Sequence, residues 1–87
     1  MRRIGVILEM HRLMKDAETV YYYHKDAQYA IKLGDRAIAI YEGDRELSEI
    51  PVAKDLYKKL LNFVGEVYAD LRDERFKSYI DRFFQTY

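Results

Sequence analysis

The two histidines, His11 and His24, are the side chains whose unperturbed pKa lies nearest neutrality, and they are the first candidates for chemistry. A metal site would need two or three ligands at a helical i,i+4 spacing or facing one another across a hairpin. Each histidine instead has one acidic residue two positions away, Glu9 for His11 and Asp26 for His24. The chain has no cysteine, so disulfides and thiolate ligands are excluded. We therefore predict no metal and no cofactor.

Carboxylates and hydroxyls are the next groups that could take part in a reaction. Three pairs of carboxylates lie close together in the sequence: Asp16 and Glu18, Glu42 and Asp44, and Asp73 and Glu74. They fall at the ends of expected helices and in turns, where acidic residues serve as caps. Ser48 and Ser78 lack the strand–turn–helix context of a nucleophile elbow, and the glycines are not clustered as in a phosphate-binding loop. The sequence predicts a protein that is not an enzyme.

Length and charge limit the remaining possibilities. The 87 residues make one domain, 1–87, with 49% hydrophobic residues, enough for a small core. Fifteen basic residues balance fifteen acidic ones, so no net field attracts nucleic acid or an anionic membrane. The first apolar run stops at Glu9, and no run approaches the ~20 residues of a membrane span, which predicts a cytoplasmic protein. Many charged residues with only one Asn and two Gln are typical of proteins from hot environments.

The N-terminal segment, residues 3–17, has the spacing of a helix. Apolar side chains recur every three or four positions at Ile4, Ile7, Leu8, His11 and Met14. The alternative is a short strand over residues 4–8, since a continuous apolar run of that length also suits a buried strand. We favour the helix because the period continues beyond Leu8.

Residues 19–47 predict an antiparallel meander of three or four strands. Gly34-Asp35 separates two runs of alternating apolar residues and fits a two-residue type II′ turn. That turn would place Ile31 opposite Ile38, and Tyr29 opposite Ile40 on the same face. The alternative is a helix over residues 17–41 with Gly34 as its C-cap, because the same apolar residues also follow a helical period.

The C-terminal third predicts two antiparallel helices. Pro51 is suited to the first turn of a helix, and Gly65 is expected where another element packs closely. Asp55 and Lys59 are spaced as a favourable i,i+4 ion pair. The first helix has a wide apolar arc, and the second would turn a further set inward: Phe76, Tyr79, Ile80, Phe83, Phe84 and Tyr87. With both helices on one face of the meander, the fold class is α+β.

The predicted function rests on tyrosines. Alternation along the strands would expose Tyr21, Tyr23, Lys32 and Tyr41 on the free sheet face, and tyrosine is enriched at the centres of protein interfaces. We therefore predict a small protein-binding module, regulatory, inhibitor-like or assembly-directed, of the kind that viruses and mobile elements often encode. Its partner would be another protein. The candidate surface for self-association into a homodimer is the second stripe of the long helix: Tyr57, Leu61, Val64 and Tyr68.

The alternative function is nucleic-acid binding. Exposed tyrosines can stack on bases, and a basic stripe on the first helix would supply phosphate contacts. The residues of that stripe are Arg2, Arg3, Arg12 and Lys15. The even balance of charge weighs against this function, because phosphate neutralisation supplies most of the affinity for a polyanion.

Overall fold

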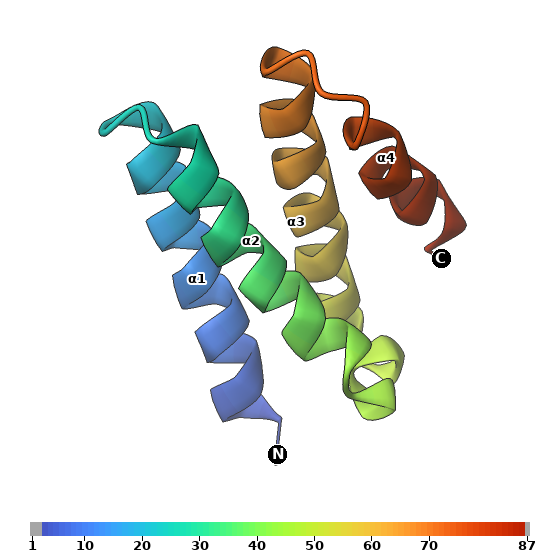
Figure 1. Ribbon diagram of the computed structural model, residues 1–87. Helices are drawn as coiled ribbons and strands as arrows, with labels where there is room; N and C mark the ends of the chain where they lie inside the picture. The colour runs from blue at the N-terminus through green and yellow to red at the C-terminus, as the bar shows by residue number, and fades with distance from the viewer. Residues whose placement is uncertain (1–2, 87) are drawn as a thin grey trace.

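The computed structural model describes residues 3–86, and these residues form helices joined by short turns. No strand occurs in this range, so the predicted α+β fold class is wrong. The elements are α1 (Ile4–Tyr22), α2 (Ala27–Glu42), the 3-10 helix η1 (Arg45–Glu49), α3 (Pro51–Asp70) and α4 (Phe76–Gln85) (Figure 1).

Helix α1 confirms the predicted N-terminal helix and continues beyond it. The prediction ended at residue 17, whereas the helix runs through Tyr22. Its buried side chains keep the 3.6-residue period along the whole core side: Ile7, Met10, Leu13, Met14 and Ala17. Residues 19–24, predicted as the first strand, therefore form the last turn of this helix and the start of the loop after it.

Helix α2 replaces the predicted hairpin. It begins after Asp26, whose side chain accepts a hydrogen bond from the backbone N–H of Tyr29 at 3.1 Å. It ends at Gly43, whose N–H donates to the carbonyl of Ala39 at 2.9 Å. Gly34-Asp35 lies in the middle of the helix and makes no turn. The predicted fourth strand is also absent, because residues 45–49 form the 3-10 helix η1.

Gly34 has a packing role in place of the predicted turn. A Cβ atom added there would lie 2.5 Å from Cγ2 of Val64, so only glycine lets α2 approach α3 this closely. The buried residues of α2 recur at helical spacing around Gly34: Ala30, Ile31, Leu33, Ala37, Ile38 and Tyr41. Ile31 and Ile38, which were paired across strands in the prediction, thus lie on the buried side of a helix, whereas Tyr29 is 49% exposed.

Helices α3 and α4 confirm the two predicted C-terminal helices. Pro51 occupies the first turn of α3, as expected. Gly65 packs against α4, where an added Cβ would lie 3.2 Å from Cδ1 of Ile80 and 3.4 Å from Cβ of Tyr79. The close-packing role predicted for this glycine is therefore confirmed.

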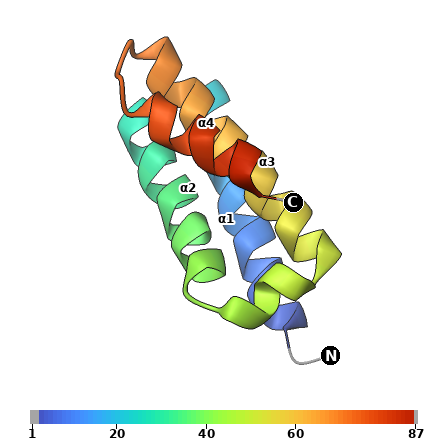
Figure 2. The same cartoon turned by 90° about the vertical axis from the view of Figure 1, so that its right-hand side faces the viewer.

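The helices pack mainly on their neighbours in sequence. Helices α1 and α3 run in one direction and α2 and α4 in the other, as Figures 1 and 2 show. Extensive contacts join α1 to α2, α2 to α3, and α3 to α4, whereas α1 and α3 touch only sparsely. The fully buried large side chains lie where α1, α2, η1 and α3 meet: Met10, Leu13, Leu47, Leu60, Leu61, Val64 and Val67.

Tyrosine–carboxylate hydrogen bonds tie α2, α3 and α4 together. The hydroxyl of Tyr57 donates to Oε2 of Glu42 at 2.6 Å, and Nη1 of Arg82 donates to the same oxygen at 2.8 Å. The hydroxyl of Tyr79 donates to Oδ1 of Asp35 at 2.6 Å. Burial, followed by these hydrogen bonds, raises the pKa of Tyr57 and of Tyr79 above the ordinary range. This side of the molecule is closed by both packing and polar contacts.

Candidate functional site

The four residues predicted to bind a partner do not form one surface. Tyr21 and Tyr23 lie at the C-terminal end of α1, whereas Lys32 and Tyr41 lie on α2. Tyr41 is buried and stacks on Tyr57, with ring centroids 4.0 Å apart. Tyr23 and Lys32 are exposed, so they alone of the four keep the predicted accessibility. The tyrosine-rich sheet face is a wrong prediction because the described residues form no sheet.

Tyr21 has a structural contact that the sequence did not indicate. Its hydroxyl donates to Oδ2 of Asp70 at 2.5 Å and so joins the C-terminal ends of α1 and α3. This hydrogen bond, with a smaller contribution from burial, raises the pKa of Tyr21 to about 12. The phenol is therefore held between two helices and is not free for a partner.

The predicted self-association stripe lies inside the molecule. Its four residues are at most 6% exposed: Tyr57, Leu61, Val64 and Tyr68. The apolar arc of α3 is wide because α2 packs on one part of it and α4 on another. These side chains are therefore core residues of the single chain, and the extra width of the arc is explained by α4.

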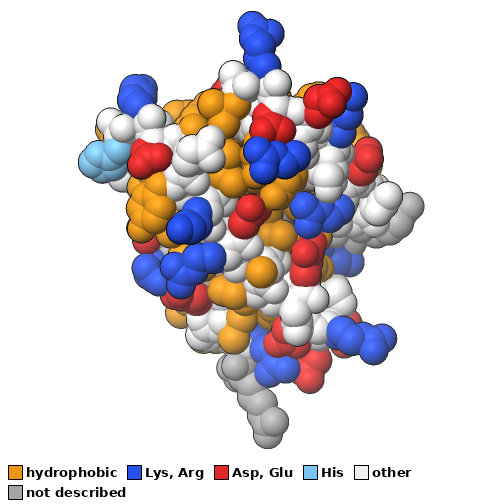
Figure 3. Space-filling view, viewed as in Figure 1, with side chains coloured by type: hydrophobic (Ala, Val, Ile, Leu, Met, Phe, Trp, Pro, Cys, Tyr) orange, Lys and Arg blue, Asp and Glu red, His pale blue; other side chains and the backbone are white. Residues whose placement is uncertain are grey.

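The predicted basic stripe on α1 is paired with acidic residues. Nε of Arg3 lies 2.7 Å from Oδ2 of Asp44, and Arg12 contacts Glu9 at 2.8 Å and Asp16 at 3.2 Å. Nζ of the remaining member, Lys15, lies 3.6 Å from Oε1 of Glu18, and Arg2 is outside the described residues. On the face over α2, Figure 3 also shows basic and acidic side chains intermingled. The described part of the stripe does not present unbalanced positive charge.

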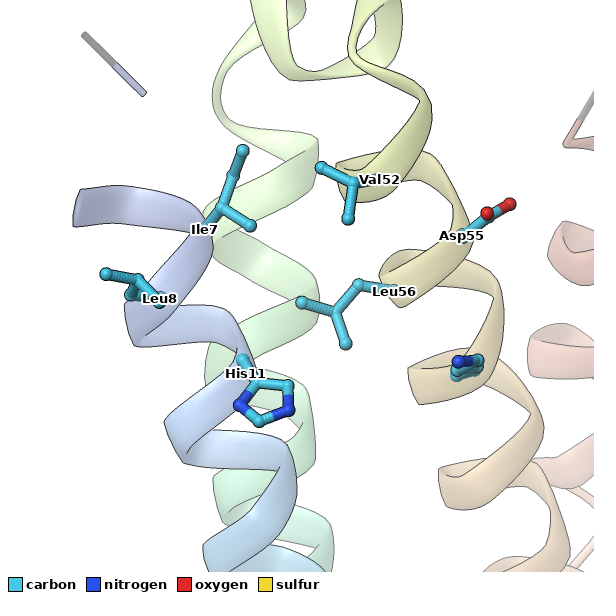
Figure 4. A pocket seen from close by; sticks show the side chains of 7 residues that line it. Ile7, Leu8, His11, Val52, Asp55 and Leu56 are labelled. Carbon is cyan, nitrogen blue, oxygen red and sulfur yellow. The ribbon is translucent and has the colours of Figure 1, made fainter. Parts of the chain in front are cut away.

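A concave feature with a mainly apolar lining is a groove between α1 and α3. Its volume is about 380 Å³, and its apolar floor is made by Ile7 and Leu56. Figure 4 shows these side chains facing one another between the two helices, with α2 behind them. The remaining lining residues are Leu8 and His11 from α1, and Val52, Asp55 and Lys59 from α3. The groove exists because α2 covers only one side of the α1–α3 pair.

Large aliphatic side chains stand exposed along this groove. Leu8 is 62% exposed, Val52 is 59% exposed, and Ile4, one turn before Leu8, is 55% exposed. A single exposed leucine carries no information, because most protein surfaces contain some. Leu8 and Val52 are different, because both line one apolar furrow and contiguous exposed apolar surface marks contact sites.

Three titratable side chains lie on the rim of the groove: His11, Asp55 and Lys59. The predicted ion pair between Asp55 and Lys59 is not formed, and neither residue makes a salt bridge with any described residue. No hydrogen bond orients His11 toward Asp55 within the described chain. The rim therefore offers opposite charges for recognition but no oriented acid–base pair of the kind that catalysis uses.

The furrow continues toward the other end of the two helices. A second hollow shares Lys59 with the first and is lined by Met14, Glu18, Tyr22, Asn62, Phe63 and Glu66. The lining residues of α1 run from Ile7 to Tyr22, 16 positions that span about 24 Å along the helix. The groove is thus apolar at the N-terminal ends of α1 and α3 and polar toward their C-terminal ends.

Sequence reasoning missed this site for a specific reason. Ile4 and Leu8 belong to the helical stripe that the prediction assigns to the core, and Val52 lies outside both apolar stripes predicted for the long helix. Period alone shows which side of a helix is apolar, but not how much of that side a neighbour covers. The extra width of the apolar stripe on α1 was the sequence feature that could have indicated the groove.

The rest of the described chain offers no metal site, and comparison with known proteins gives no family. Within residues 3–86, no group of three or more His, Asp or Glu side chains is placed to hold a metal ion. No helix in that range combines the length and apolarity that crossing a bilayer requires. Comparison of the chain with protein-family models, with curated proteins and with solved structures found no match.

Proposed function

We propose that this chain is a non-enzymatic protein-binding module that acts through the groove between α1 and α3. The observation that supports the proposal is the pair of aliphatic side chains, Leu8 and Val52, more than half exposed beside a floor of Ile7 and Leu56. Burying exposed apolar surface is the main driving force of association. The proposal places the protein in the cytoplasm, where it works by assembly or regulation.

The shape of the groove favours a helix as the bound element. Helix-in-groove recognition lays the apolar side of an amphipathic helix into a furrow between two helices. Here α1 and α3 run in the same direction, and the residues of α1 that line the furrow span about 24 Å, the length of some 16 helical residues. A helix placed there would cover the side of α1 and α3 that α2 leaves open and would complete a four-helix arrangement.

A small molecule suits the groove less well than a protein. Pockets for small ligands enclose most of the ligand surface, commonly about 70–90% or more. Two of the lining side chains, Leu8 and Val52, are themselves more than half exposed, and the furrow is open along its length. Nucleic acid is disfavoured by the ion pairs of Arg3 and Arg12, which place carboxylates beside the cations.

The proposal is tested by comparing three forms of the protein as bait in cell extracts of the source organism. Leu8→Asp combined with Val52→Asp places charge in the groove, and Phe84→Asp, on α4, is the matched control at an equally exposed apolar residue. Circular dichroism first verifies that all three forms are folded. We expect the wild type and the Phe84 variant to retain the same protein, identified by mass spectrometry, and the double variant to lose it. Equal retention by the double variant contradicts the proposal.

A further inference from the structure

We infer that the occupant of the α1–α3 groove is a second copy of this chain, related by a two-fold axis that crosses the helices at the level of Asp55 and Lys59. The inference rests on the proposed function, since it uses the same groove. The partner is identified by charge. When one copy is rotated about the two-fold axis, each charge on its rim faces the opposite charge on the rim of the other copy.

The first argument is the arrangement of the two rim charges. Asp55 and Lys59 lie one turn apart on the same side of α3, and both border the groove. In a two-fold contact, if residue i meets residue j, then j also meets i. Two antiparallel α3 helices with the axis between these levels would therefore place Asp55 of each copy opposite Lys59 of the other. Two ion pairs follow from one pair of residues, and neither residue has a salt bridge within the described chain that this contact would break.

The second argument is the apolar surface at the same level of the groove. Leu8 and His11 on α1 line the same hollow as Asp55 and Lys59, so they lie close to the proposed axis. The antiparallel contact would place Leu8 of each copy against this part of α1 in the other copy. The exposed leucine would then be covered in both copies. Helices α1 and α3 of the two copies would together form a four-helix bundle with two layers.

The third argument is the overall charge. Fifteen basic and fifteen acidic residues give a formal net charge of zero, so two identical copies approach without long-range repulsion. A net charge near zero favours association of like molecules. An apolar groove with balanced rim charges on a neutral protein is thus suited to a neutral partner with the same pattern, and a second copy has that pattern.

The first test is the mass of the protein in solution. Light scattering and sedimentation over about two orders of magnitude in concentration should show the wild type moving from the 10.5 kDa monomer to twice that mass. Leu8→Asp should remain monomeric over the whole range, while Phe84→Asp should behave as the wild type. A wild type that stays monomeric throughout, or a Leu8 variant that dimerises normally, overturns the inference.

The second test isolates the contacts between copies. Asp55→Lys and Lys59→Glu each place like charges opposite one another across the axis, so each variant alone should dimerise at least about tenfold more weakly than the wild type. A mixture of the two variants should recover association as a heterodimer. In it, the lysine introduced at position 55 of one chain faces the glutamate introduced at position 59 of the other, and the unchanged Asp55 and Lys59 face each other. Mixing changes no contact within either chain, so recovery reports only the pairs between chains. Absence of recovery in the mixture overturns the proposed axis.

These experiments separate failure of the inference from failure of the proposed function. A monomeric wild type that still captures another protein through Leu8 and Val52 overturns the second copy but supports the groove. Groove variants that change neither the mass nor the capture overturn both. Circular dichroism spectra that match the wild type, and equal thermal melting at concentrations where the wild type is monomeric, confirm that a lost association is not a lost fold.

Discussion

The two sides of α3 differ in both packing and composition. Toward α2 and α4, its side chains are fully covered: Leu61 and Val64 are inaccessible, and glycines at positions 34 and 65 allow close contact. Toward α1, its first turns border an open groove with Val52 exposed. The closed side is apolar in sequence, whereas the open side mixes Val52 and Leu56 with Asp55 and Lys59. Stability therefore comes mainly from the closed side, and the open side is available for a partner.

Alkaline pH is expected to produce the largest effect, because it acts together on the two tyrosine hydrogen bonds of the closed side and on the bond of Tyr21 between α1 and α3. The raised pKa of Tyr57 and of Tyr79, and that of Tyr21 at about 12, mean that the folded protein holds phenolic protons that the unfolded chain loses near its ordinary pKa of 10.0. Unfolding then releases protons, so the stabilising contribution is complete below pH 10 and is lost as pH rises above it. Urea denaturation at several values of pH should show the free energy of unfolding falling from pH 10 upward. A constant value up to pH 12 contradicts the assignment.

Shortening a leucine to alanine should have the next largest effect on stability, and the effect should differ between the closed core and the groove. Leu61→Ala removes atoms from the closed core and should lower the free energy of unfolding by about 2–5 kcal/mol. Leu8→Ala on the groove should change it by no more than about 0.5 kcal/mol, because the side chain is mostly in water in the single chain. Urea denaturation of both variants, at concentrations where the chain is monomeric, measures the difference. Similar losses at the two positions contradict the comparison.

Alanine substitutions at two glycines should change the free energy of unfolding in opposite directions. Gly34→Ala should destabilise the fold by about 1–3 kcal/mol, because the added methyl group collides with Val64 between α2 and α3. Gly5→Ala should stabilise it by about 0.5–1 kcal/mol, because no atom lies within 4 Å of the added group and alanine favours the helix. Thermal denaturation should therefore shift the midpoints in opposite directions. A stabilised Gly34 variant would show that α2 and α3 are not in close contact.

Removal of one tyrosine hydroxyl is expected to have the smallest effect on stability. Tyr79→Phe removes the hydrogen bond to Asp35 and should cost about 1–2 kcal/mol, since the acceptor is a carboxylate that water rehydrates in part. Tyr23→Phe should be close to neutral, because Tyr23 is exposed and its hydroxyl makes no hydrogen bond within residues 3–86. The Tyr79 variant should also lose less stability above pH 10 than the wild type does. Equal effects of the two substitutions would remove the hydrogen bond as the cause.

The sequence predicted three of the four long helices and failed at α2. Between residues 29 and 40, the apolar residues alternate and also recur every three or four positions, so both periods fit this short window. The prediction favoured strands because the Gly-Asp pair suits a two-residue turn. The decisive signals were Asp26 as an N-cap and Gly43 at the C-cap, which bound a 16-residue helix. The requirement for glycine at position 34 arises from Val64, 30 positions away, and no local pattern could show it.

The location of the site could not be predicted from the sequence. A protein-binding module without a metal stays a prediction, whereas the predicted surface depended on strand alternation and disappeared with the strands. Tyr41, Tyr57 and Tyr68 lie inside because helices α2, α3 and α4 meet there. The exposure of Leu8 and Val52 depends on the absence of a neighbour against that part of α1 and α3 among residues 3–86. Such an absence is a property of the assembled fold, and its trace in the local sequence is the wide apolar stripe of α1.

The neighbour-to-neighbour order of helix packing has a consequence for how the chain reaches its native state. Because each helix docks chiefly on the one just before or after it, little of the chain must close a long loop before contacts form. Small helical domains with such local contacts refold within microseconds to milliseconds. Refolding from urea should therefore be largely complete within the dead time of a stopped-flow instrument. A single proline, Pro51, leaves little scope for a slow phase.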